Sequence, residues 1–152
     1  MINIAIIDDD KTFCDDFEEQ IKKIDNSYNT DCYYDINTFL ESVSSYNIAI
    51  IDIMLGKDNG IDIASAITEK YPNIKIIFIS VEQDFFQDVY SVNHLYFLVK
   101  PISNEQLKQA LSVCCSEINK QTLYTKFGSG TTAINLNDVS YFEGILKKTI
   151  VH

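Results

Sequence analysis

The feature that most limits what this chain can fold into is a series of short apolar runs, three of them rich in isoleucine, separated by segments of helical periodicity. The runs are Ile2–Ile7, Cys32–Tyr34, Ile48–Ile53, Ile74–Ile79 and Leu95–Val99. Runs of this length match β-strands, and near-continuous apolar strands are typical of parallel sheets covered on both faces. The pattern therefore predicts a sheet of five parallel strands.

Each run is followed by apolar residues at helical spacing. They are Phe13, Phe17, Ile21 and Ile24; Phe39, Leu40 and Val43; Ile63, Ala64, Ile67 and Tyr71; Phe85, Phe86, Val89 and Tyr90; and Leu107, Leu111, Cys114 and Ile118. Strands that alternate with helices favour βαβ units joined by right-handed crossovers. The prediction is an α/β fold, a flavodoxin-like (βα)5 doubly wound parallel sheet with strand order 2-1-3-4-5.

The pattern changes after Lys120. Three segments, 123–127, 131–136 and 139–142, alternate in polarity or carry β-branched residues, with turn residues between them. A tail of about 30 residues cannot bury a core of its own. We therefore expect one domain over residues 1–120, and over 121–152 a short C-terminal β tail that opens a second, incomplete domain.

Composition narrows the function classes. The formal net charge is −10 and all twelve basic residues are lysines, so nucleic-acid binding by this segment alone is not expected. The apolar runs are too short to span a bilayer, and the N-terminus lacks the features of a secretory signal. We expect a cytoplasmic protein without membrane contact. Its four cysteines lack metal-binding spacing and are expected to be free thiols.

Polar side chains stand at the carboxyl ends of four predicted strands. Asp8 and Asp9 follow the first strand and Asp52 lies near the end of the third. Ser80 ends the fourth strand, and Lys100 follows the fifth. In a doubly wound sheet these ends lie at one edge, where ligands bind. We therefore expect three carboxylates, a hydroxyl and an ammonium to meet in one shallow cleft.

The chemistry of such a cleft is restrictive. Clustered carboxylates repel one another unless a cation is present, and Mg²⁺ is a hard cation that takes oxygen ligands and phosphate oxygens together. Lys100 can neutralise the remaining charge. Asp52, ionised at neutral pH, can accept a phosphoryl group without a base, and Ser80 can donate a hydrogen bond to it. Each residue alone has an ordinary explanation, such as the favourable helix dipole for Asp8–Asp10, but their joint placement favours phosphoryl chemistry.

Residues 1 to about 120 resemble the receiver domains of bacterial two-component response regulators. The resemblance rests on the segments IAIIDDD, AIIDIMLGKDNGI, IIFIS and YFLVKPI. It implies that Asp52 takes a phosphoryl group from a sensor histidine kinase and that Asp9 binds Mg²⁺ directly. It further implies that Asp8 assists through water and that the main-chain oxygen of Met54 is another metal ligand.

The same resemblance assigns the switch. Ser80 would be the switch hydroxyl, Lys100 the lysine of the site, and Phe97 the aromatic residue whose rotamer follows activation. A cis peptide bond is expected before Pro101. We expect homodimerisation through the face formed by the fourth helix, fifth strand and fifth helix. That face was expected to bear Phe85, Phe86, Tyr90, Tyr96 and Leu107.

The tail resembles the opening strands of a LytTR-type (LytR/AlgR-like) DNA-binding domain, on the segment INLNDVSYFEGILKKTIVH. This implies a parent transcription regulator cut short early in that domain. DNA would then be contacted only through the missing part beyond His152, so no DNA-contacting residue is assigned.

Two positions depart from the receiver pattern. Gly56 stands where proline is common, which predicts a more flexible loop. Val81 stands where a smaller residue is usual, and its branched side chain is expected to slow phosphotransfer or lengthen the life of the phosphoryl group. Glu82 beside it could repel or position attacking water.

Two other functions remain open from the sequence. One is a stand-alone receiver that acts by protein contact. The other is a Mg²⁺-dependent phosphohydrolase, whose aspartate nucleophile would lie in Asp8–Asp10, although no insertion is long enough for a cap over its pocket. A flavodoxin-like FMN binder would need a phosphate loop after the first strand, which is lacking. We expect no enzyme activity other than the chain's own aspartyl phosphorylation and dephosphorylation.

Overall fold

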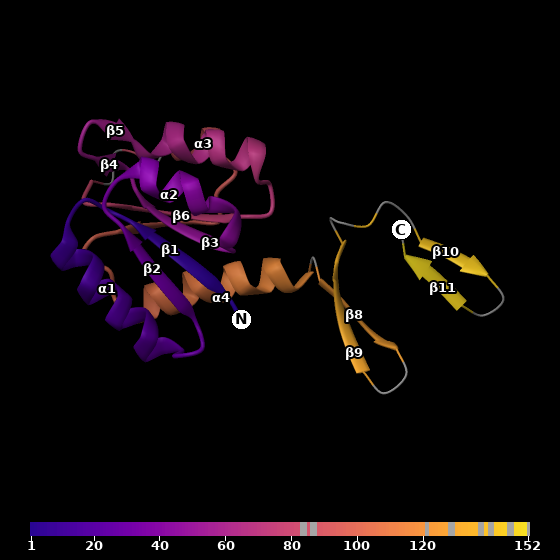
Figure 1. Ribbon diagram of the computed structural model, residues 1–152. Coiled ribbons are helices and arrows are strands. Elements are labelled where there is room, and N and C mark those ends of the chain that lie inside the picture. Colours follow the sequence, from indigo (N-terminus) through magenta and orange to yellow (C-terminus); the bar gives the residue numbers. More distant parts are fainter. Residues whose placement is uncertain are drawn as a thin grey trace. The chain divides into compact units, whose positions relative to one another are not determined.

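The computed structural model describes residues 1–82, 85, 88–120, 122–127, 130–136, 139, 142–145 and 148–151 (Figure 1). The chain divides into two compact units, Met1–Cys114 and Cys115–His152. The first unit contains the parallel sheet, and the second contains two hairpins. The predicted assignment of residues 121–152 to the start of a further domain stays a prediction.

The first unit is built on one five-stranded parallel sheet. Its strands are β1 (Asn3–Ile7), β2 (Asn29–Tyr33), β3 (Ile48–Asp52), β6 (Lys75–Ser80) and β7 (Tyr96–Val99), in the order β2-β1-β3-β6-β7. Every neighbouring pair is parallel. This arrangement confirms the predicted 2-1-3-4-5 sheet and brings the carboxyl ends of β1, β3, β6 and β7 to one edge.

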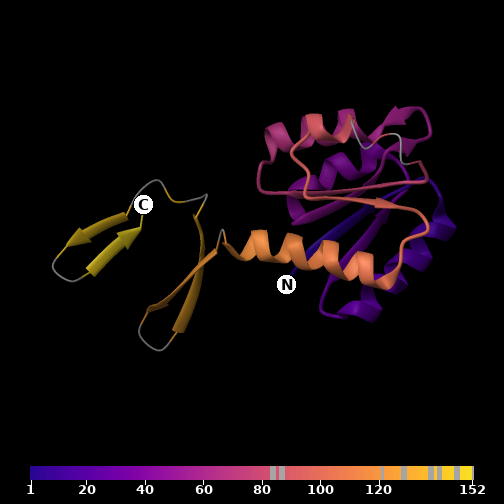
Figure 2. The same cartoon turned by 180° about the vertical axis from the view of Figure 1, so that it is seen from behind.

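Helices cover both faces of the sheet. They are α1 (Lys11–Ile24), α2 (Ile36–Ser42) with the 3-10 turn η1 (Val43–Ser45), α3 (Gly60–Lys70) and α4 (Asn104–Lys120). Figures 1 and 2 show α1 and α4 on one face and α2 and α3 on the other. Each of these four helices begins at a side-chain cap, which satisfies free N–H groups of the first turn. The caps are Asp10, Asp35, Asn59 and Ser103.

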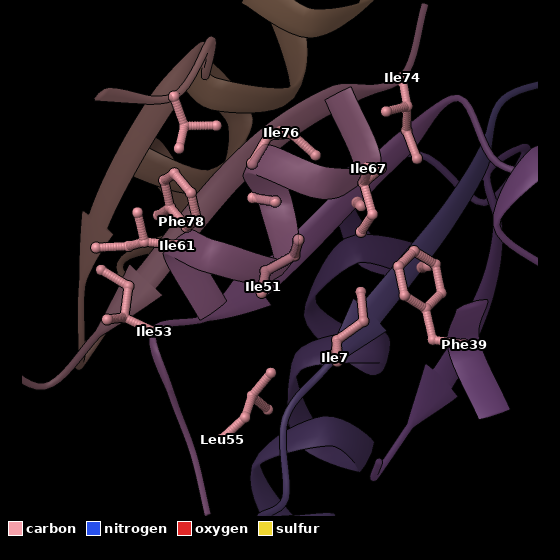
Figure 3. Close-up of a cluster of buried hydrophobic side chains, with 14 of the residues drawn as sticks. Ile7, Phe39, Ile51, Ile53, Leu55, Ile61, Ile67, Ile74, Ile76 and Phe78 are labelled. Atoms are coloured by element: carbon pink, nitrogen blue, oxygen red, sulfur yellow. The ribbon is translucent and has the colours of Figure 1, made fainter. Parts of the chain in front are cut away.

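The core explains why the strands are so rich in isoleucine. Side chains of alternate strand residues, such as Ile7, Ile51 and Phe78, pack under α2 and α3 against Phe39 and Ile67 (Figure 3). The intervening residues of the central strands, such as Ile6, Ile50 and Ile77, are also fully buried, on the face covered by α1 and α4. Because both faces are covered, the central strands β1, β3 and β6 show no polar alternation.

The segment expected to form the fourth helix differs from the prediction. Its described part contains the 3-10 helix η3 (Asp88–Ser91), in which the Val92 N–H donates to the Val89 carbonyl oxygen across 3.1 Å. Val89 and Val92 are both buried, and a spacing of three residues suits a 3-10 turn better than an α-helical stripe. Phe86 lies outside the described residues.

Leu107 is a further correction, because its side chain is fully buried in the core and therefore does not lie on the expected dimer face. α4 turns this position toward the sheet, together with Ala110 and Leu111. Tyr96 and Phe85 remain half-buried.

No helix among the residues placed by the structure has the length and apolarity needed to cross a bilayer.

The described residues of the second unit form four short strands in two antiparallel hairpins, where three strands were expected. β8 (Thr122–Phe127) pairs with β9 (Gly130–Asn135), and β10 (Phe142–Ile145) pairs with β11 (Lys148–Val151). The third predicted segment began too early, because Val139 lies outside any strand. β11 was not predicted, since a four-residue run gives too little periodicity to separate a strand from a loop.

Candidate acidic phosphoacceptor site

Lys100 joins two carboxylates at the edge of the sheet. Its Nζ lies 2.5 Å from Asp8 Oδ2 and 2.6 Å from Asp52 Oδ2. The Asp8 side chain is 1% exposed, that of Asp52 9% and that of Lys100 14%, so all three groups lie largely out of water. We call Asp8, Asp9, Asp52 and Lys100 the acidic cleft. Direct ion pairs thus join three of the five groups that were predicted to meet here, namely Asp8, Asp52 and Lys100.

The backbone register places these side chains. Ile7 pairs with Ile51, so the residues that follow them, Asp8 and Asp52, lie side by side at the ends of β1 and β3. The Lys100 N–H donates to the carbonyl oxygen of Ser80 across 2.8 Å, which holds the start of the next loop against β6. The cleft is therefore fixed by strand pairing.

Burial and pairing act against each other on these groups. Burial raises the pKa of Asp8 by more than the hydrogen bond from Lys100 and that from the Asp10 N–H lower it. For Lys100, burial is the largest single influence and lowers its pKa. The hydrogen bonds with Asp52 and Asp8 together outweigh burial and leave the pKa of Lys100 above its usual value. The Lys100 ammonium therefore stays charged, whereas burial disfavours the ionised form of the Asp8 carboxylate that pairs with it.

The loop after β3 shapes the other side of the cleft. Met54 N–H donates to Asp52 Oδ1 across 3.0 Å. β4 (Met54–Leu55) and β5 (Asp58–Asn59) form a small hairpin whose two-residue turn starts at Gly56, with φ +58°. A positive φ at this position is typical of a type II′ turn and suits glycine. Proline cannot adopt this backbone conformation, which explains why glycine stands at position 56. The predicted flexibility of the loop stays a prediction.

Asp9 lies on the open side of the cleft. It is exposed, and its Oδ2 is 3.7 Å from where a Cβ on Gly56 would stand. Within the described part of the chain, no three or more His, Cys, Asp and Glu side chains are arranged to hold a metal ion. Asp8, Asp9 and Asp52 therefore do not form a ready-made cage. The donors nonetheless fit Mg²⁺, which needs only one or two carboxylates and keeps several waters.

Ser80 and its neighbours form the far wall. The Ser80 side chain is fully buried, and its Oγ accepts a hydrogen bond from Glu82 N–H across 3.1 Å. Val81 between them is 65% exposed. Phe97 is half-buried and packs against the core beside β6. The peptide bond between Lys100 and Pro101 is cis, as expected.

Sequence reasoning missed the role of Phe13, which was noted only as an apolar residue at helical spacing. Its ring centroid lies 3.9 Å from Lys100 Nζ, so its face caps the ammonium in a cation–π contact. Phe13 also lines a hollow of about 430 Å³ beside the cleft, together with Val81 and Pro101. The position of Phe13 one turn after the acidic run could have indicated this role, because the first turn of α1 faces the strand ends.

The fold and the cleft define the class of protein. A flavodoxin-like sheet with two buried carboxylates, a bridging lysine and a buried serine at its edge is the arrangement expected of a signalling receiver. Residues 4–112 match the family model described as the response regulator receiver domain. The chain belongs to this family, whose members act in two-component signalling.

Individual relatives agree with this membership. The Sensory transduction protein LytT of Bacillus cereus is 25% identical over 114 residues, which are 73% of this chain and 46% of LytT. The chain thus spans about half the length of that relative. A CheY-like receiver domain protein from Methanospirillum hungatei has a TM-score of 0.70 at 20% identity, over 79% of this chain and 98% of that one. TrrA from Thermotoga maritima, in complex with Mg²⁺ and BeF, has a TM-score of 0.67 at 21% identity, over 75% and 99%.

Proposed function

We propose that this chain accepts a phosphoryl group on Asp52 from the phosphohistidine of a sensor histidine kinase in the cytoplasm. The observation that carries the proposal is the placement of Lys100 Nζ between Asp8 and Asp52, in a largely buried cleft. A buried cation shared by two carboxylates is costly to build for stability alone. Its use is to compensate charge when a phosphoryl group arrives.

The transfer needs little from the protein beyond position and charge. An oxygen of the ionised Asp52 carboxylate attacks phosphorus, and the bond from phosphorus to the donor imidazole nitrogen breaks. The electron pair of that bond stays on the imidazole. Lys100 Nζ, already 2.6 Å from Asp52 Oδ2, is close enough to pair with an oxygen of the transferred group.

The site is suited to a magnesium ion. Asp8, Asp9, Asp52 and the main-chain oxygen of Met54 would hold it, with water completing the shell. When bound, Mg²⁺ supplies charge neutralisation for the phosphoryl oxygens. The largely buried carboxylates of Asp8 and Asp52 support this assignment, and TrrA, of the same fold, was crystallised with Mg²⁺ and BeF.

Phosphorylation would then switch the surface near β7. The phosphoryl group adds nearly one negative charge and new acceptor oxygens at Asp52. The Ser80 hydroxyl, which now accepts from Glu82 N–H, would turn to donate to the new oxygens. That movement would let half-buried Phe97 turn inward and change the face formed by η3, β7 and α4. We propose that homodimerisation through this face completes activation.

The output domain that the switch controls would belong to the rest of the regulator. Because LytT is about twice as long as the matched region, a further domain that regulates transcription is the natural output. We propose that residues 121–152 open a LytTR-type DNA-binding domain. The two hairpins β8–β9 and β10–β11 support this, since a domain that reads DNA through β-segments needs strands there.

The test is uptake of a phosphoryl group from a small phosphodonor. Intact mass spectrometry of the wild type with acetyl phosphate and Mg²⁺ should show a species heavier by about 80 Da, the mass of one phosphoryl group. Asp52→Asn should not gain it. The matched control is Asp58→Asn, an exposed aspartate in the neighbouring hairpin, which should behave as wild type. Equal uptake by Asp52→Asn would overturn the proposal.

A further inference from the structure

Two cysteines with no role in the acidic cleft face each other between α1 and β2. The Cys32 thiol donates to the main-chain oxygen of Cys14 across 3.7 Å. Both cysteines are free thiols. The two cysteines therefore lie next to each other across a helix–strand interface.

The packing of α1 on β2 shows why they meet. Thr30 Oγ1 donates to Glu18 Oε1 across 2.7 Å. Cys32 lies two residues further along β2, a rise of about 6.6 Å, and Cys14 lies one helical turn earlier on α1, a rise of about 6 Å. Thr30–Glu18 and Cys32–Cys14 are thus successive contacts of one antiparallel helix–strand packing. The two cysteines face each other because two residues of β2 and one turn of α1 advance by nearly the same distance.

The two thiols differ in access. Cys14 is fully buried, whereas Cys32 is half-buried on the edge strand and can be reached from solvent. Interaction with the Cys14 side chain lowers the pKa of the Cys32 thiol and outweighs the effect of burial. Cys32 is therefore the thiol that meets an oxidant, and Cys14 is placed to react with it next.

We propose that Cys14 and Cys32 form a reversible disulfide when the protein meets a peroxide. The Cys32 sulfur attacks one peroxide oxygen, the O–O bond breaks, and a sulfenic acid forms with release of one water from hydrogen peroxide. The Cys14 sulfur then attacks the sulfenic sulfur and a second water leaves. In total the two thiols lose two protons and two electrons, and the peroxide is reduced to two molecules of water.

The disulfide would act on the acidic cleft. Cys14 Sγ donates to the main-chain oxygen of Asp8 across 3.5 Å, and this donor is lost when the disulfide forms. Asp8 is also the residue whose carboxylate pairs with Lys100. We therefore expect slower uptake of phosphoryl groups by the oxidised protein. This consequence rests on the proposed function, whereas the disulfide itself does not.

The disulfide is tested by mass and mapping on the full chain. Cys114→Ala/Cys115→Ala is the matched background, because it leaves only the proposed pair. Treated with equimolar hydrogen peroxide, it should lose about 2 Da and regain them with a thiol reductant. The digest should contain a peptide that joins Cys14 to Cys32, and adding Cys32→Ser should abolish both results. The unsubstituted chain should yield the same joined peptide.

Three results would overturn the proposal: only oxygen addition, only cross-links between molecules, or a 2 Da loss that survives Cys32→Ser. Measuring phosphoryl uptake before and after oxidation tests the regulatory effect separately from the disulfide itself. Unchanged uptake in the oxidised protein would remove the regulatory consequence and leave the disulfide. No uptake by the reduced protein would count against the proposed function alone.

Discussion

Gly60 lies directly against the main chain of Asp52. A Cβ on Gly60 would overlap the carbonyl oxygen of Asp52 and come within 3.0 Å of the Cα of Ile53. The Gly60 N–H also donates to the Ile53 carbonyl oxygen across 2.9 Å. The first residue of α3 and the last residue of β3 are thus in direct backbone contact, and any side chain at position 60 must move Asp52.

Gly60→Ala is therefore predicted to lower the free energy of unfolding by about 3 kcal/mol, because backbone atoms must separate to admit the methyl group. Urea denaturation measures the loss. Gly56→Ala is the matched control. Its new methyl group meets no backbone, so only its positive φ is penalised and about 1 kcal/mol should be lost. Equal losses in the two variants would contradict the close approach.

Lys100→Met is predicted to cost about 3 kcal/mol in magnesium-free buffer, because Asp8 and Asp52 are left buried beside each other without a partner. Added Mg²⁺ should restore part of this loss by taking the place of the ammonium. Denaturation with and without Mg²⁺ checks both statements. Lys57→Met, on the exposed hairpin turn, should show neither effect. A loss that Mg²⁺ does not change would argue against a shared cation position.

Asp8→Asn is predicted to stabilise the metal-free protein by about 1 kcal/mol at neutral pH. The pKa of Asp8 is raised above 3.8 by burial, so the folded chain holds this proton more tightly than the unfolded chain. The stability due to Asp8 is then complete below pH 3.8 and is lost as the pH rises through the raised folded value. Asparagine does not titrate and can keep the hydrogen bond from Asp10 N–H.

The measurement is the difference in free energy of unfolding between Asp8→Asn and wild type from pH 3 to 7. The difference should be small at the acid end and grow in favour of the variant as Asp8 ionises in the wild type. Asp58→Asn, which is exposed, supplies the baseline. A difference that shrinks with rising pH would contradict a raised pKa for Asp8 in the folded protein.

Val81→Ala is predicted to shorten the life of the phosphoryl group about threefold, which is roughly 0.6 kcal/mol in the barrier. Val81 is exposed and lines the hollow beside Lys100, so its removal opens a path for water. Loss of label from phosphorylated protein gives the rate. Val113→Ala, another exposed valine, is the control. Equal rates for Val81→Ala and wild type would contradict the prediction.

The sheet and most of the cleft follow from the sequence for a physical reason. Parallel strands covered on both faces need continuous apolar residues, which mark the strands in the sequence. The carboxyl ends of these strands share one edge of the sheet, so the sequence alone places Asp8, Asp52 and Lys100 together. Continuous apolar runs and helical spacing are local signals, so the sequence shows them directly.

What could not be predicted depends on contacts between distant residues. The cation–π contact of Phe13 with Lys100 joins the first helix to the end of the last strand. The positive φ of Gly56 is set by a two-residue turn that the sequence does not distinguish from a longer loop. The 3-10 turn η3 arises because burying Val89 and Val92 needs only three residues of chain. None of these leaves a periodic pattern in the sequence.

The most direct test of the account is to locate the phosphoryl group on the chain. Protein phosphorylated by acetyl phosphate is reduced with borohydride, which converts an acyl phosphate side chain to an alcohol, and the digest is sequenced by mass spectrometry. The account predicts homoserine at position 52 and at no other aspartate. Homoserine at Asp8 or Asp10 would contradict it and favour a hydrolase nucleophile after the first strand.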